Sequence, residues 1–159
     1  MDQTQLRRYL EDHVAGADVG LTIATRLDRE HPGTEVAEVM SRMSRDIRSE
    51  RALVVDALRR LDAPPDPVRR AMGLVGSLGR LAASLPFVPG PSLLEDLEAL
   101  AVGVWGKRLL WGALARVQES EGGFDGIDFD ELSTSAEEQE RQLLALRQQA
   151  IVEVLDLAA

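Results

Sequence analysis

Apolar residues recur at spacings of three and four along most of the chain, which is the pattern of one helical face. The first such stretch covers residues 5–30. The second follows Thr34, a favourable N-cap, and stops at the proline-rich run 62–67. The third begins after Ser92, and the fourth follows an acidic, glycine-bearing loop at residues 119–129. We therefore expect four long amphipathic helices.

The connection between the second and third helices decides the topology. It holds roughly 29 residues, enough to cross a bundle lengthwise at up to about 3.3 Å per extended residue. The second and third helices would then run parallel, which is the one-crossover arrangement of ferritin-like folds. The alternative is a five-helix up-and-down array. We predict an all-α, ferritin-like four-helix bundle with a short helical crossover, forming a single domain over residues 1–159.

Each of the four apolar stripes is interrupted by one polar residue. These are His13, Glu50, Lys107 and Gln139, and Lys107 is the only lysine in the sequence. At 1.5 Å per residue, the crossover topology places all four at nearly the same level. Asp46 lies one turn from Glu50, and Glu98 borders the third stripe. We predict a buried polar layer made of His13, Asp46, Glu50, Glu98, Lys107 and Gln139.

Two interpretations of this layer are open. The first is an internal ion-pair network that fixes helix register. The second is a metal centre for metal handling or oxidative stress. A di-iron or di-manganese bundle needs Glu-x-x-His on two helices, and here Glu50 is followed three residues on by Leu53 and Asp46 by Ser49. A lysine in the layer would also repel a cation. We therefore favour the network and predict no metal ligands and no cofactor.

Composition narrows the function classes further. The formal net charge of −9 argues against nucleic acid as a partner, because the phosphate backbone would be repelled. The absence of cysteine excludes disulfides, thiol catalysis and zinc–thiolate sites. No nucleophile stands beside a base, so we expect no catalytic residues and no enzyme activity. The start of the chain lacks signal-peptide features, and no apolar run would span a bilayer, so we expect a cytoplasmic protein without a transmembrane segment.

The connection between Val68 and Phe87 is a second unusual region. Its local charge is +3 in an acidic protein, and its three glycines allow another surface to approach the backbone closely. One interpretation is a crossover packed along an acidic bundle. The other is a docking surface for a second copy, a protein partner or an anionic membrane face. We expect a packed crossover that contributes to a homodimer.

The chain resembles a group of uncharacterised bacterial ferritin-like four-helix-bundle proteins. The residues that carry the resemblance are Asp12-His13 with Ala15-Gly16-Ala17, Asp46 with Glu50-Arg51, Glu98 with Gly103 and Gly106-Lys107, then Trp111 and Glu137-Glu138-Gln139. The resemblance implies the bundle fold and no particular activity. Metal-bearing relatives would place ligands in this layer, but the missing Glu-x-x-His means that their redox chemistry is not carried over. The expected role is therefore binding or interaction without catalysis.

Overall fold

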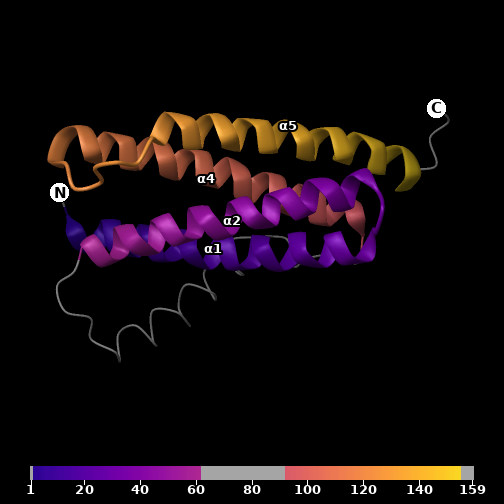
Figure 1. Cartoon of the computed structure of the whole chain (residues 1–159), viewed down its shortest axis with the longest axis horizontal. Helices are drawn as coiled ribbons and strands as arrows, with labels where there is room; N and C mark the ends of the chain where they lie inside the picture. Colours follow the sequence, from indigo (N-terminus) through magenta and orange to yellow (C-terminus); the bar gives the residue numbers. More distant parts are fainter. Residues whose placement is uncertain (1, 62–91, 155–159) are drawn as a thin grey trace, which may run out of the picture.

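The computed structural model describes residues 2–61 and 92–154, with side chains up to residue 152. Within these ranges the regular elements are four α-helices, so the prediction of an all-α fold is confirmed (Figure 1). They are α1 (Gln3–Glu30), α2 (Glu35–Arg60), α4 (Leu93–Glu121) and α5 (Phe129–Val154). None of these helices combines the length and the apolar character that crossing a bilayer requires.

Local side-chain chemistry explains where the helices begin. The Thr34 hydroxyl accepts a hydrogen bond from the Ala37 amide, and the Ser92 hydroxyl accepts one from the Glu95 amide. Both N-caps satisfy backbone donors that the first turn would otherwise leave free. Gly33 takes a φ of +76° in the turn between α1 and α2, a conformation that favours glycine. Both predicted caps are thus confirmed.

The helices α2 and α4 run parallel. In Figure 1, α1 and α5 run in one direction and α2 and α4 in the other. Contacts agree: Arg60 at the end of α2 donates to the Gly123 carbonyl just beyond α4, and Gln149 near the end of α5 donates to Glu35 at the start of α2. The end of α2 and the start of α4 therefore lie at opposite ends of the bundle. The predicted helical crossover lies outside the described residues.

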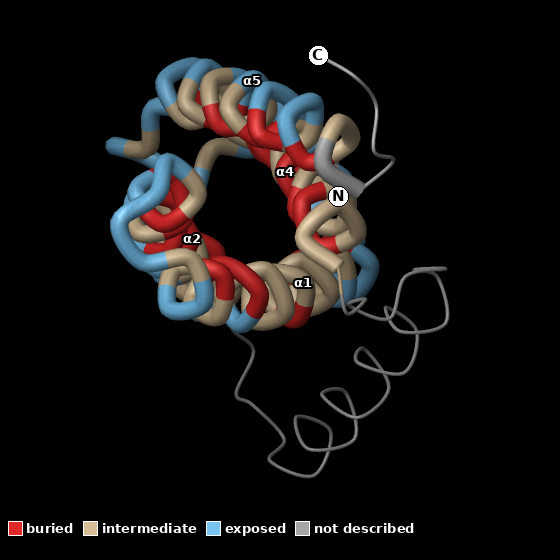
Figure 2. Tube along the Cα trace, turned by 90° about the vertical axis from the view of Figure 1, so that its right-hand side faces the viewer, coloured by how far each residue is buried: buried red, intermediate tan, exposed pale blue. Residues whose placement is uncertain are grey.

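Figure 2 shows buried positions along all four helices. Their apolar side chains form two clusters. The cluster nearer the α1–α2 turn includes Ile23, Leu27, Met40, Leu97 and Leu143. The cluster nearer the α4–α5 loop includes Leu10, Val54, Trp111, Leu114 and Phe129. Along α2 and α4, the buried polar contacts of Glu50 and Lys107 fall between these clusters, so a polar level divides an otherwise apolar interior.

Candidate functional site

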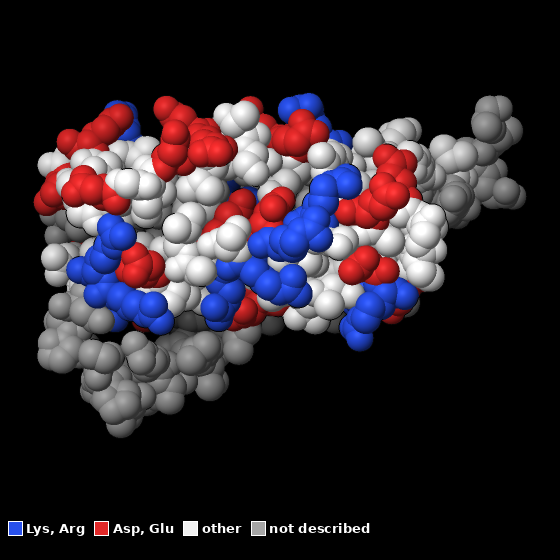
Figure 3. Space-filling model, viewed as in Figure 1, with Lys and Arg blue, Asp and Glu red and all other residues white. Residues whose placement is uncertain are grey.

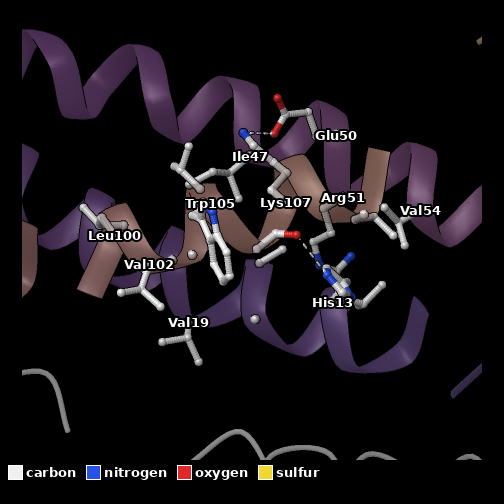
Figure 4. Close-up of a pocket in the computed structure, with 18 of the residues that line it drawn as sticks. His13, Val19, Ile47, Glu50, Arg51, Val54, Leu100, Val102, Trp105 and Lys107 are labelled. Atoms are coloured by element: carbon white, nitrogen blue, oxygen red, sulfur yellow. Dashed lines mark hydrogen bonds and ion pairs between the residues drawn. The ribbon is translucent and has the colours of Figure 1, made fainter. Parts of the chain in front are cut away.

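Lys107 is the centre of a hydrogen-bonded network that joins three helices. Its Nζ atom, on α4, donates to Oε2 of Glu50 on α2 at 2.6 Å (Figure 4). The same Nζ atom donates to Oε1 of Gln139 on α5. The Gln139 amide then donates to Oδ2 of Asp46 on α2 at 3.1 Å. The structure thus brings together four of the six residues that the sequence placed in the polar layer.

The central ion pair is largely enclosed. Glu50 is 5% exposed, and the Lys107 side chain is 14% exposed. Burial raises the pKa of the Glu50 carboxyl, while the Lys107 ammonium acts in the opposite direction and the Asp46 carboxylate adds to the rise. Removing either partner would leave the other without compensation in a region from which water is mostly excluded. Each charge therefore depends on its neighbour.

His13 lies beside this network but binds backbone atoms. Its Nδ1 atom is 2.9 Å from the Tyr9 carbonyl oxygen, and its Nε2 atom is 3.3 Å from the Gly106 carbonyl oxygen. A neutral imidazole donates from one nitrogen only, whereas the imidazolium donates from both. His13 therefore links α1 to the backbone of α4 one residue before Lys107.

Glu98 lies outside the layer, contrary to its predicted place. Its Oε1 atom accepts a hydrogen bond from Nε of Arg147 on α5 at 2.8 Å. The two side chains are 30% and 36% exposed. Glu98 lies nine residues before Lys107, roughly 13 Å along α4. The difference arises because a residue nine positions before Lys107 lies at a different level of the bundle and on another side of α4.

Asp96 is a second buried acid, and the sequence did not predict its burial. The Asp96 side chain is 1% exposed, and its Oδ2 atom accepts a hydrogen bond from Arg26 of α1 at 2.6 Å. This hydrogen bond raises the pKa of the Arg26 guanidinium, which also pairs with Glu30 at 3.0 Å. Asp96 falls in the first turn of α4, where an acid is expected to face solvent and favour the helix dipole. No sequence signal distinguished it from such an acid.

An apolar groove opens between α1 and α4, with one wall completed by α2 (Figure 4). Its volume is about 320 Å³, and His13, Glu50 and Lys107 are among its lining residues. The apolar lining includes Val102 and Trp105, which are 54% and 53% exposed. The groove therefore places an open apolar surface directly beside the polar network.

Two glycines of α4 contribute to this opening. Gly103 and Gly106 line the groove, and a Cβ atom added at either position would have no atom of the described residues within 4 Å. Both positions have ordinary helical conformations, so the glycines are not required by backbone strain. Their effect is to leave space where a larger residue would project.

The outer surface carries a separate arginine-rich band. Figure 3 shows basic side chains gathered over α2, with acidic side chains over α5. Arg42, Arg45 and Arg48 are exposed on α2, and no carboxylate of the described residues lies within ion-pair distance of them. Arg45 and Arg48 instead donate to oxygens of Ser41 and Ser44. The positive charge of this band is confined to one part of the surface, whereas the chain as a whole has a net charge of −9.

The donor set does not resemble a metal centre. Within residues 2–61 and 92–154, no three His, Asp or Glu side chains are grouped as metal ligands. The most enclosed carboxylate of the layer, Glu50, is bound to an ammonium group.

Searches against protein-family models, curated proteins and solved structures give no match to the chain. The network and the groove are therefore the features on which a functional proposal rests.

Proposed function

We propose that this protein is a non-catalytic binding protein with a ferritin-like bundle topology. The Lys107 network holds three helices in register, and the groove between α1 and α4 receives the bound molecule. The parallel course of α2 and α4 supports the topology, since it is the arrangement that one long crossover produces. The position of the polar residues between two apolar clusters supports the register role, as for single buried polar residues in coiled coils.

The observation that carries the proposal is that the network is internally paired beside an open groove. Lys107 is bound to Glu50 and Gln139, and His13 has a carbonyl oxygen facing each ring nitrogen. General acid–base catalysis needs a group that is free to exchange a proton with a substrate. These groups are instead held by neighbouring side chains and, for His13, by backbone carbonyl oxygens, which suits a rigid wall for binding.

A neutral fluorescent dye tests the binding role. We would titrate Nile red into the wild-type protein and into Gly103→Leu, which fills the groove and also raises helix propensity. Gly112→Leu is the matched control, since Gly112 is an exposed glycine of the same helix that does not line the groove. We expect saturable one-to-one binding to the wild type and the control, and loss of binding in Gly103→Leu. Equal binding to all three proteins would contradict the proposal.

Elemental analysis separates this role from metal handling. The untagged protein would be purified without chelator and then exposed to Fe(II) and Mn(II). We expect less than one equivalent of metal to remain after desalting. Stoichiometric metal that disappears in Glu50→Gln would replace the binding proposal with a metal centre at the layer.

A further inference from the structure

The arginine-rich band of α2, formed by Arg42, Arg45 and Arg48, holds positive charge that the described residues do not neutralise. The three arginines are exposed and follow one another at intervals of three residues, about 4.5 Å of helix rise each. Arg45 donates to the Ser41 hydroxyl and Arg48 to a backbone carbonyl oxygen, and no carboxylate in the described part of the chain lies within ion-pair distance of the band. Like charges on adjacent turns of a helix repel one another. An acidic group from another molecule would relieve this repulsion.

The helix α5 carries negative charge on the same side of the bundle. In Figure 2, α2 and α5 are neighbours, and Figure 3 shows acidic side chains over α5. Glu131, Glu138 and Gln149 fall on one stripe of α5, because spacings of seven and eleven residues are close to two and three helical turns. Gln149 donates to Glu35 of α2, so this stripe faces the α2 side. We call Glu131 and Glu138 the acidic stripe.

The carboxylate of Glu138 is open to a further partner. Its side chain is 47% exposed, and it pairs with Arg141 of the same helix, which is 70% exposed. It also accepts a hydrogen bond from Gln142. An exposed ion pair between residues three apart contributes little, and an ionised carboxylate can accept about four hydrogen bonds. A second base can therefore bind Glu138 without a large loss.

Arg45 and Glu138 lie at nearly the same level along the bundle. Each is followed directly in the sequence by a member of the hydrogen bond between Gln139 and Asp46, which measures 3.1 Å. A two-fold axis that runs parallel to the helices, in front of α2 and α5, keeps this level and exchanges the two helices. It therefore places the partner's Glu138 opposite Arg45 in both copies.

We propose that the α2–α5 face binds a second copy of this chain in a two-fold symmetric dimer. The arginine-rich band of each copy contacts the acidic stripe of the other. An isologous interface uses the same surface on both copies, so this surface must carry both complementary groups, and the α2–α5 face does. The binding groove opens between α1 and α4, so the dimer leaves it open and does not depend on the proposed binding role. The contacts join exposed charges, so the dimer is weak and sensitive to salt.

Sedimentation velocity of the full-length chain over a concentration series measures the dimer. We expect the wild type to dimerise at about 0.05 M sodium chloride and to be monomeric at about 0.5 M, because salt screens exposed charges. Arg45→Glu and Glu138→Arg should each weaken the dimer about tenfold or more, since an attraction becomes a repulsion. The combined variant should recover the wild-type affinity, because the two charges are exchanged across the interface. Arg116→Glu, the control, makes the same change of charge as Arg45→Glu at an exposed position of α4.

Each outcome decides for or against the dimer. A wild type that stays monomeric at low salt would overturn it. A dimer that survives both single reversals, or that weakens equally in Arg116→Glu, would mean that another surface joins the copies, and would overturn it too. Loss in both single variants without recovery in the combined variant would rule out the pairing of Arg45 with Glu138. Nile red should bind the monomer and the dimer equally, so loss of dye binding would overturn the groove proposal alone.

Discussion

Two buried acids in this bundle are paired with bases in different ways. Glu50 is 5% exposed and Asp96 is 1% exposed. The bases differ more: the Lys107 side chain is 14% exposed, whereas that of Arg26 is 32% exposed. Arg26 also reaches Glu30, whose side chain is 51% exposed. The first pair is enclosed on both sides, and the second joins a buried carboxylate to a base that faces solvent.

The difference shows that the exposed fraction of one partner is not enough to tell how far an ion pair is shielded from water. Water can approach the Arg26 guanidinium, and its planar set of donors spans from the interior to the surface. The Lys107 ammonium has the amide of Gln139 and the Glu50 carboxylate as its neighbours. A group that loses its partner in the enclosed pair has little access to water. The enclosed pair should therefore be the more sensitive to single substitutions.

The largest effect is expected for Lys107→Met. This change leaves the Glu50 carboxylate buried without its ammonium partner, so we expect a loss of about 3–5 kcal/mol in the free energy of unfolding at pH 7. Urea denaturation followed by circular dichroism would measure it. Arg116→Met is the control, because Arg116 and Glu119 are 84% and 69% exposed and their pair should contribute almost nothing. Equal losses in the two variants would contradict the comparison.

The cost of Lys107→Met should depend on pH. The folded-state pKa of Glu50 is already raised by burial, and removing the ammonium raises it further. A carboxyl with a raised folded pKa contributes stability below its unfolded pKa, about 4.3, and loses it as pH rises through the folded pKa. The difference between the variant and the wild type should therefore be small near pH 4 and grow toward pH 7. A difference independent of pH would show that Glu50 is not its source.

A smaller effect is expected for Arg26→Met. Asp96 loses a charge-assisted hydrogen bond, but solvent near the exposed side of the pair can compensate in part. We expect a loss of about 2 kcal/mol, within the usual range for a hydrogen bond to a charged group. Glu30→Gln is the control and should cost less than about 0.5 kcal/mol, since it removes only the exposed partner. A loss for Arg26→Met that exceeds that of Lys107→Met would reverse the comparison.

The sequence predicted the enclosed pair and missed the other for a physical reason. Lys107 and Glu50 interrupt regular apolar stripes, so their positions on the helices indicated burial. Asp96 lies in a helical first turn, where acids are common at the surface, and its partner Arg26 is 70 residues away. The four helices could be predicted from local periodicity, and the N-caps Thr34 and Ser92 from local side-chain chemistry, whereas the Asp2 cap of α1 was not predicted. Glu98 was wrongly placed in the layer because it borders the apolar stripe, although it lies about 13 Å along the helix from Lys107 and pairs with Arg147.

Replacing both charges of the enclosed pair should cost less than replacing one. Lys107→Met combined with Glu50→Gln removes the unpaired carboxylate, so we expect the double variant to recover to within about 1 kcal/mol of the wild type. The remaining loss arises because Gln139 no longer receives a hydrogen bond from Lys107. A double-mutant cycle in urea would measure the coupling. A double variant as unstable as Lys107→Met would mean that packing, and not charge, explains the loss.

The smallest effect is expected at Glu98, the predicted layer residue that the structure places at the surface. Its pair with Arg147 is partly exposed on both sides, so solvent screens the attraction and we expect Glu98→Gln to cost at most about 0.5 kcal/mol. Arg147→Gln should have the same small effect, and both losses should shrink in 1 M salt. Urea denaturation at low and high salt would measure these changes. If Glu98→Gln cost as much free energy of unfolding as Lys107→Met, the Glu98 charge would have to be as enclosed as that of Lys107. Only an enclosed ion pair is expected to escape screening by water and salt.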